Sequence, residues 1–203
     1  MPKLTIIPVG MLQTNCMIVW DEGTRAGLLV DPGDEAPTIL ARIEQLGVKI
    51  QAILLTHSHA DHIGALPELY TRLGAPLWLA KEEQPLYFSS QNELLPWLPH
   101  VTNLPIPAQE MPPHDGFDFQ VIHTPGHTPG GVCYYFPKDK LLLSGDTLFA
   151  GGVGRTDLGG DAEALHHSVF DLLFALPDDT AVFPGHGPST TIGAEKANPP
   201  EIW

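Results

Sequence analysis

One short segment limits the possible folds of this chain more than any other feature. Four apolar residues, Ala52–Leu55, run directly into Thr56–His62, a segment with three histidines and one aspartate. A continuous apolar run of this length is typical of a strand that is buried on both faces, as in a sheet covered by helices. The sequence therefore predicts a buried strand that carries a cluster of imidazoles to the end of a sheet, where the binding sites of α/β proteins usually lie.

The side chains that follow this strand have the chemistry of metal ligands. Alternation along extended chain places His57 and His59 on the same side, and Asp61 and His62 are expected to turn toward the same region as a helix begins. Three imidazoles and one carboxylate suit zinc, and also iron or manganese. A solvent-exposed, histidine-rich turn is the alternative interpretation, and the buried strand before the cluster argues against it.

Four ligands so close in sequence can hardly all bind one ion from a single side, so further ligands are expected elsewhere. Three later predicted strands lead into loops rich in glycine or proline, and each loop carries one candidate: His127, Asp146 and His186. Glycine and proline permit the tight turns that hold a ligand in place. Four strand ends of the same kind, in order along the chain, predict one shared metal site.

Apolar spacing and turn residues predict a loop-rich α/β chain. The expected strands are Leu4–Val9, Cys16–Trp20, Ala26–Val30, Ala52–Leu55, Leu77–Leu79, Phe117–Ile122, Val132–Phe136, Leu141–Leu143 and Ala181–Phe183. The expected helices are Pro37–Leu46, Leu66–Leu73 and Ala162–Leu176. This order fits either a helix/sheet/sheet/helix sandwich or an ordinary parallel α/β sheet. Residues 81–116 contain seven prolines and are expected to form a short helix and a long loop, a kind of loop that is often functional.

Length and charge exclude several classes of protein. A chain of 203 residues fits one domain, expected here over residues 1–203. The net charge of −14 repels phosphate backbones, so nucleic-acid binding is disfavoured. No apolar run approaches the roughly 18 residues of a membrane span, and no signal-like pattern opens the chain, so a cytoplasmic protein without membrane contact is expected. Cys16 and Cys133 lie in apolar stretches and are predicted to be buried thiols.

The motifs around these candidate ligands resemble those of the metallo-β-lactamase superfamily, from the first strands to the last histidine-containing loop. The resemblance implies a four-layer αββα sandwich. It also implies two metal sites. The first is formed by His57, His59 and His127, the second by Asp61, His62 and His186, and Asp146 is a ligand shared by both. Asp31 is expected to orient the metal-binding loop from behind the ligands. An aspartate at position 146, where many β-lactamases of the superfamily have cysteine, argues against antibiotic hydrolysis.

The chemistry implied by such a site is metal-dependent hydrolysis. Two divalent ions close together lower the pKa of a bridging water from about 15.7 to about 7, which gives a hydroxide at neutral pH. One ion would polarise the substrate carbonyl and the other would stabilise the oxyanion or the leaving thiolate. Zinc is the expected metal, with iron or manganese as alternatives. No serine or cysteine nucleophile is required, and Asp61 is expected to act as a catalytic residue that aligns the hydroxide.

Two further stretches, Gly145–Arg155 and Pro184–Pro188, are similar to those of the glyoxalase II family of hydroxyacylglutathione hydrolases. This resemblance implies hydrolysis of a small-molecule thioester such as S-lactoylglutathione, with Arg155 in contact with the glutathione part. Seventeen residues follow His186, so a C-terminal helical domain like that of the longer members is not expected, and Thr156–Asp157 stand where those members usually have aromatic residues. The chain is therefore expected to be a short, single-domain member of this family.

Alternatives from two classes stay open. Gly154–Asp157 is also similar to the persulfide dioxygenases, which use one iron, whereas Pro184–Pro188 looks more like the hydrolases. A non-catalytic metal platform or a di-iron redox domain is the alternative of another class, although the sequence shows no flavin-binding module. A nuclease is disfavoured by the charge. The protein is expected to be a monomer or a small homo-oligomer.

Overall fold

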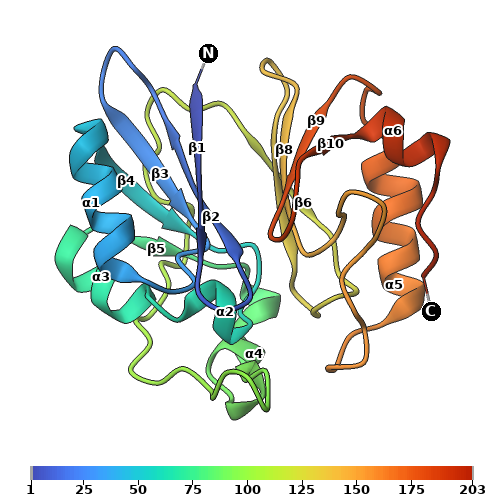
Figure 1. Ribbon diagram of the computed structural model, residues 1–203, viewed down its shortest axis with the longest axis horizontal. Helices are drawn as coiled ribbons and strands as arrows, with labels where there is room; N and C mark the ends of the chain where they lie inside the picture. Colours follow the sequence, from blue (N-terminus) through green and yellow to red (C-terminus); the bar gives the residue numbers. More distant parts are fainter. Residues whose placement is uncertain (1, 203) are drawn as a thin grey trace. The chain divides into compact units, whose positions relative to one another are not determined.

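Ten short strands form two five-stranded sheets in the computed structural model, which describes residues 2–202 of the chain (Figure 1). The first sheet has the order β1-β2-β3-β4-β5 and the second the order β10-β9-β8-β7-β6. The strands are β1 (Lys3–Val9), β2 (Thr14–Trp20), β3 (Ala26–Val30), β4 (Lys49–Leu54), β5 (Leu77–Trp78), β6 (Gln120–His123), β7 (Val132–Phe136), β8 (Leu141–Gly145), β9 (Ala181–Pro184) and β10 (Thr190–Thr191).

The helices are short, and most of them lie between strands. They are α1 (Ala36–Leu46), α2 (Ala60–Ile63), α3 (Leu66–Leu73), α4 (Gln84–Tyr87), α5 (Ala162–His166) and α6 (Ile192–Ala197). Three 3₁₀ segments and one π-helical segment complete the set, namely η1 (Lys81–Glu83), η2 (Ser90–Asn92), η4 (Leu173–Ala175) and the π-helical η3 (His167–Leu172). None of the helices described between residues 2 and 202 is both long enough and apolar enough to cross a bilayer.

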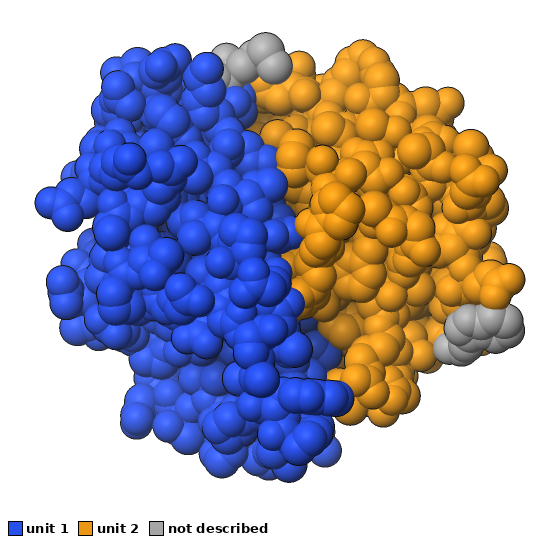
Figure 2. Space-filling view, viewed as in Figure 1, with its two compact units in different colours: residues 1–117 blue, residues 118–203 orange. Residues whose placement is uncertain are grey.

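The polypeptide separates into two compact units, residues 1–117 and 118–203, which Figure 2 shows in different colours. Each unit contains one of the two sheets and its own apolar core. The predicted organisation as one domain over residues 1–203 stays a prediction.

The first sheet is mixed, with antiparallel pairs β1/β2 and β2/β3 and parallel pairs β3/β4 and β4/β5. Helices α1 and α3 pack against it (Figure 1), because their helical spacing gathers apolar residues on one side. The core that they form with the strands includes Ile18, Leu29, Ile39, Ile43, Ile53, Leu66 and Leu69. This layered packing fixes the ends of β3 and β4, from which the first group of candidate ligands emerges.

The second sheet is also mixed, since β8 and β9 are parallel while the other neighbours are antiparallel. Helical residues Leu165, Val169 and Leu173 pack against strand residues Cys133 and Leu142 in its core. Because β8 and β9 run in the same direction and Gly145 pairs with Pro184, the residues after both strands emerge at one edge of the sheet.

The nine predicted strands and two of the three predicted helices appear within a few residues of their expected places. The prediction of a short helix and long loop for residues 81–116 is confirmed, and both cysteines are buried free thiols as expected. The expected helix Ala162–Leu176 is helical along most of its length, but only α5 is α-helical, and π and 3₁₀ turns follow it. Apolar spacing indicates which side of a helix is buried but does not fix the hydrogen-bond register, so the pattern could not reveal this change.

Candidate functional site

The first group of candidate ligands follows two parallel strands of the first sheet. Val30 at the end of β3 pairs with Leu54 at the end of β4, and the backbone N–H of Asp31 donates to the Leu54 carbonyl at 3.1 Å. The carboxyl ends of parallel strands share one edge of a sheet, as the sequence predicts. Asp31 and the segment that begins at Thr56 therefore lie side by side.

Asp31 holds this segment in place through both carboxylate oxygens. Its Oδ1 accepts from the Thr56 N–H at 2.8 Å, and its Oδ2 accepts from the Thr56 hydroxyl at 2.6 Å. The same Oδ2 lies 3.0 Å from Nδ1 of His62. If Nδ1 carries the proton and donates it here, Nε2 holds the lone pair that a metal requires. Asp31 thus occupies the position of a residue that orients a ligand.

The histidines of the cluster lie together, and all of them are buried. The ring centroids of His57 and His62 are 4.0 Å apart, and those of His57 and His59 are 5.0 Å apart. Asp61 accepts from the Thr14 hydroxyl at 2.9 Å, and its Oδ2 lies 3.6 Å from His62 Nε2. Asp31, His57 and His62 also form a group with metal-binding spacing. Since both oxygens of Asp31 already accept hydrogen bonds, we assign it to orienting His62 and not to binding an ion.

Two glycines allow the loop after β3 to lie against the helix that carries Asp61 and His62. A Cβ atom added to Gly33 would be 1.7 Å from the carbonyl oxygen of Asp61, and one added to Gly64 would be 2.3 Å from the carbonyl oxygen of Gly33. Any side chain at Gly33 would therefore push α2 away. This contact fixes the height of Asp61 and His62 above the sheet edge.

A fully buried carboxylate that the sequence patterns did not indicate also contacts this cluster. Glu83 is 0% exposed, and its Oε1 accepts from both the N–H and the hydroxyl of Ser58, at 3.0 and 2.7 Å. Ser58 stands between His57 and His59. No local pattern marks Glu83, since it lies in the proline-rich segment 25 residues from its partner.

The second group of candidate ligands lies in the second unit and also follows parallel strands. Asp146 comes directly after β8, and His186 comes two residues after β9. Oδ2 of Asp146 is 3.6 Å from Nε2 of His127 and 3.5 Å from Nε2 of His186. The carboxylate is therefore placed between the two imidazoles, each of which faces it through Nε2. A carboxylate with this placement has the geometry of a shared ligand.

The backbone of Gly154 and Arg155 supports both Asp146 and His127. The carbonyl oxygen of Arg155 lies 2.6 Å from Nδ1 of His127 and accepts its proton in the tautomer whose Nε2 faces Asp146. A Cβ atom added to Gly154 would be 2.1 Å from the Asp146 carbonyl oxygen and 2.8 Å from the ring of His127. Glycine at position 154 is what permits this close approach.

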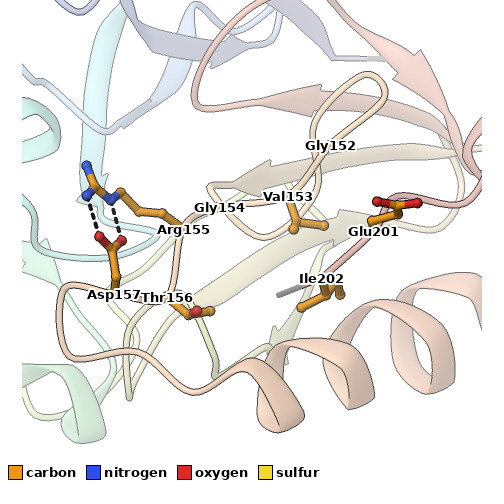
Figure 3. A pocket seen from close by; sticks show the side chains of 8 residues that line it. All are labelled: Gly152, Val153, Gly154, Arg155, Thr156, Asp157, Glu201 and Ile202. Carbon is orange, nitrogen blue, oxygen red and sulfur yellow. Dashed lines mark hydrogen bonds and ion pairs between the residues drawn. The ribbon is translucent and has the colours of Figure 1, made fainter.

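The side chain of Arg155 lies at a pocket of about 420 Å³ in the second unit (Figure 3). The pocket is lined by Gly152, Val153, Gly154, Arg155, Thr156, Asp157, Glu201 and Ile202. Two hydrogen bonds of 2.6 Å join the Arg155 guanidinium to the Asp157 carboxylate. They lower the pKa of Asp157 and raise that of Arg155. Arg155 is about half exposed, as a substrate contact would need, but an acid on its own loop already pairs with it.

Neither cysteine has the properties of a nucleophile. Burial raises the pKa of Cys16, with a further increase from the charge of Asp31, and burial raises the pKa of Cys133 to about 11. Both thiols are therefore protonated at neutral pH, and Cys133 donates to the carbonyl of Ser144. The candidate site therefore offers imidazoles and carboxylates, and neither cysteine offers it a thiolate.

The two groups fit divalent metal ions by the chemistry of their donors. The first offers three imidazoles and Asp61, and the second offers two imidazoles and Asp146. Buried carboxylates are costly unless a positive charge or hydrogen bonds compensate them, and Asp61 and Asp146 are only 6% and 9% exposed. Nitrogen and carboxylate donors together suit zinc, iron and manganese without selecting one of them.

Known proteins share this fold and sequence over nearly the whole chain. The profile of the metallo-β-lactamase superfamily matches residues 9–186. A hydroxyacylglutathione hydrolase, GloC, from Haemophilus influenzae is 39% identical and covers 98% of this chain and 97% of its own. BLEG-1 B3 metallo-β-lactamase, for which a crystal structure is known, is 36% identical in sequence. Its structure matches this one with a TM-score of 0.87, over 97% of this chain and 98% of the other. TTHA1623, for which a crystal structure in a di-iron-bound form is known, is 40% identical in sequence. Its structure matches with a TM-score of 0.80, over 95% of this chain and 96% of the other.

The chain belongs to the metallo-β-lactamase superfamily. The fold class expected from the sequence is thereby confirmed, with two mixed sheets that carry helices. In this superfamily the protein is a metal-dependent hydrolase, and its histidine and aspartate clusters have the chemistry of metal ligands.

Proposed function

We propose that this protein hydrolyses a small-molecule thioester of glutathione, such as S-lactoylglutathione. The observation that carries the proposal is the 39% identity with a hydroxyacylglutathione hydrolase along 98% of the chain. The aligned region covers 98% of the chain and therefore spans both groups of candidate ligands and the loop of Arg155. The absence of a reactive cysteine is compatible with a hydrolase that takes its nucleophile from water.

We propose that the two groups of ligands act together on a pair of metal ions. One ion is assigned to His57, His59 and His127, the second to Asp61, His62 and His186, and Asp146 is assigned to both. When bound, such a pair supplies a hydroxide at neutral pH and stabilises the charge that develops on the thioester. The metal is proposed to be zinc, and the di-iron form of a relative that is 40% identical makes iron the first alternative.

In this proposal other residues of the chain hold the ligands in the geometry that hydrolysis requires. Asp31 and the carbonyl of Arg155 fix the tautomers of His62 and His127 by accepting from Nδ1. Thr14 donates to Asp61 and so limits the directions in which its carboxylate can point. The Arg155 side chain would contact the glutathione part of the substrate at the rim of its pocket. Ligands that are already oriented lose little freedom when substrate binds, which is favourable for catalysis.

The test combines metal content with substrate specificity on one sample. The purified protein, reconstituted with zinc, iron or manganese in turn, is assayed for hydrolysis of S-lactoylglutathione, an acyl-coenzyme A and a β-lactam, with elemental analysis in parallel. The proposal expects about two ions per chain and preferred hydrolysis of the glutathione thioester. The His57→Ala variant should lose metal and activity together.

Several outcomes of this experiment would contradict the proposal. One iron per chain, with oxygen consumed on glutathione persulfide, would make the protein a persulfide dioxygenase instead. Preferred hydrolysis of the β-lactam would place its activity with that named for BLEG-1. A metal-loaded protein that is inactive on every thioester would favour a non-catalytic or redox role.

A further inference from the structure

The side chain of Glu83 is completely buried next to the segment that carries the first group of candidate ligands. It belongs to η1, a 3₁₀ turn at the start of the proline-rich segment. Its Oε1 accepts from the hydroxyl of Ser58 at 2.7 Å and from the Ser58 N–H at 3.0 Å. A buried carboxylate is costly unless it is compensated, so its presence at 0% exposure calls for a role.

The partner of Glu83 is the residue between two candidate metal ligands. Ser58 follows His57 and precedes His59, and it is itself 0% exposed. Two hydrogen bonds to a single residue, one from its backbone and one from its side chain, restrict both its position and its rotation. Because His57 and His59 are joined to Ser58 by peptide bonds, fixing Ser58 limits the positions from which both imidazoles extend.

We propose that Glu83 is a positioning residue for the metal site, which acts through Ser58 on His57 and His59. This inference rests on the metal-binding part of the proposed function and adds a residue to it. Outer residues of this kind orient ligands and contribute to metal affinity, typically by 10- to 100-fold.

The position of Glu83 in the chain gives the inference a second consequence. The segment that begins with Glu83 is held by hydrogen bonds along its length. The Tyr87 hydroxyl donates to the Pro105 carbonyl at 2.8 Å, and the Asn92 side chain donates to the Tyr87 carbonyl at 3.0 Å. Farther on, the N–H of Ala108 donates to the Leu77 carbonyl at 2.8 Å. Glu83 therefore links this hydrogen-bonded segment to the loop that carries His57 and His59. Metal binding to that loop should for this reason reduce hydrogen exchange in residues 81–108.

The decisive variant is Glu83→Gln, because glutamine keeps the size of the side chain but its amide oxygen is a weaker acceptor for the two hydrogen bonds from Ser58 than a carboxylate oxygen is. The matched control is Glu82→Gln, which changes the neighbouring exposed residue in the same way. Zinc affinity is measured by competition with a chelator, and cobalt-substituted protein gives an absorption spectrum that reports ligand geometry. We expect Glu83→Gln to bind zinc about 10- to 100-fold more weakly, with an altered cobalt spectrum, and Glu82→Gln to match the wild type.

A second variant protects the test against a failure to fold. Ser58→Ala removes the hydroxyl bond to Glu83 and retains the N–H bond, so we expect a smaller loss of zinc affinity in the same direction. Circular dichroism of the metal-free variants shows whether the fold is intact. If folded Glu83→Gln and Ser58→Ala bind zinc as the wild type does, with unchanged cobalt spectra, Glu83 is only a structural residue and the inference is wrong.

The same measurements separate this inference from the proposed function. Wild-type protein that binds no metal would overturn both. Wild-type protein that binds metal with an affinity dependent on Glu83, but hydrolyses no thioester, would overturn the substrate and support the positioning role. Hydrogen exchange in residues 81–108 that does not change on zinc binding would overturn the proposed link to the proline-rich segment.

Discussion

At the scale of single residues, two of the histidines present the same nitrogen for binding through different partners. Nδ1 of His62 faces the carboxylate of Asp31, and Nδ1 of His127 faces the backbone carbonyl of Arg155. In both cases Nε2 points to an aspartate, Asp61 or Asp146. A carboxylate partner makes an imidazole more basic than a carbonyl partner does, so His62 should bind its ion more strongly than His127.

Asp61 should matter more for turnover than for folding. In the Asp61→Asn variant the remaining amide oxygen can still accept from the Thr14 hydroxyl, so the packing around it is retained. A group that helps to align the attacking water typically contributes about 10²- to 10⁴-fold to the rate. We expect a fall in kcat of this size, with a melting temperature of the metal-free protein close to that of the wild type. Steady-state kinetics and thermal unfolding check this, and full activity would remove Asp61 from its proposed role.

Arg155 has two separate roles that one substitution can distinguish. Its side chain is proposed to contact substrate, whereas its carbonyl oxygen holds His127. The Arg155→Ala variant removes only the side chain, so KM for the glutathione thioester should rise about tenfold, a typical loss for one charged contact, while kcat is retained. A thioester without the glutathione part serves as the control and should show no change in KM. An unchanged KM for both substrates would show that the side chain does not bind glutathione.

The ion pair of Arg155 and Asp157 also predicts how this binding responds to pH. The pKa of Asp157 is lowered and that of Arg155 is raised, chiefly by the hydrogen bonds between them. Both groups therefore stay charged above the ordinary aspartate pKa of about 3.9, and the pair is lost only as pH falls through the lowered value. We expect the ratio of KM values for Arg155→Ala and wild type to be constant between about pH 6 and pH 9. If this ratio of KM values changed between these pH values, the pH dependence of substrate binding would come from a group other than this ion pair.

At the scale of elements, the contact between the loop after β3 and α2 depends on the absence of a side chain at Gly33. In the Gly33→Ala variant the methyl group would overlap the Asp61 carbonyl, so α2 must shift with its ligands. We expect a loss of about 1–3 kcal/mol in the free energy of unfolding, as for other overpacked sites, and a clear loss of zinc affinity. Denaturant unfolding and chelator competition measure the two effects.

The control for this prediction is Gly23→Ala, in an exposed turn of the same unit. An added Cβ there meets only an ordinary contact of 3.4 Å, so stability should change by less than about 0.5 kcal/mol. If Gly33→Ala behaves like this control, α2 is not held by the loop.

The elements that the sequence predicts well are those in which burial and periodicity agree. Strand β2 is apolar along most of its length and wholly buried, and α3 has the predicted bounds. Strand β10 has two residues and helix α6 has six, which is too short for a periodic signal. Both depend on contacts outside their own span, such as the pairing of Thr190 with Val182 and the hydrogen bond from the Gly151 N–H to the Glu195 carboxylate.

At the scale of the whole molecule, the sequence shows which residue types follow the strands but not what supports them. His127, Asp146 and His186 were recognisable because each follows a strand in a loop of glycine or proline. Glu83 was not, since its bonds to Ser58 cross 25 positions in sequence and leave no local pattern. The pairing of Arg155 with Asp157 was equally hidden, because two charges near each other in a loop indicate nothing about geometry.

A comparison of variants in the two groups tests whether they form one metal centre. Zinc at about 100 times its Kd should stabilise the wild type by about 2.7 kcal/mol for each ion bound, which raises Tm by roughly 5–10 °C per ion for a chain of this length. If His59 and His186 serve one dinuclear centre, either His59→Ala or His186→Ala should remove most of this rise, and the double variant should remove little more. Independent sites would instead give losses that add. Calorimetry of the three variants with and without zinc decides between the two, and strictly additive losses would refute a shared centre.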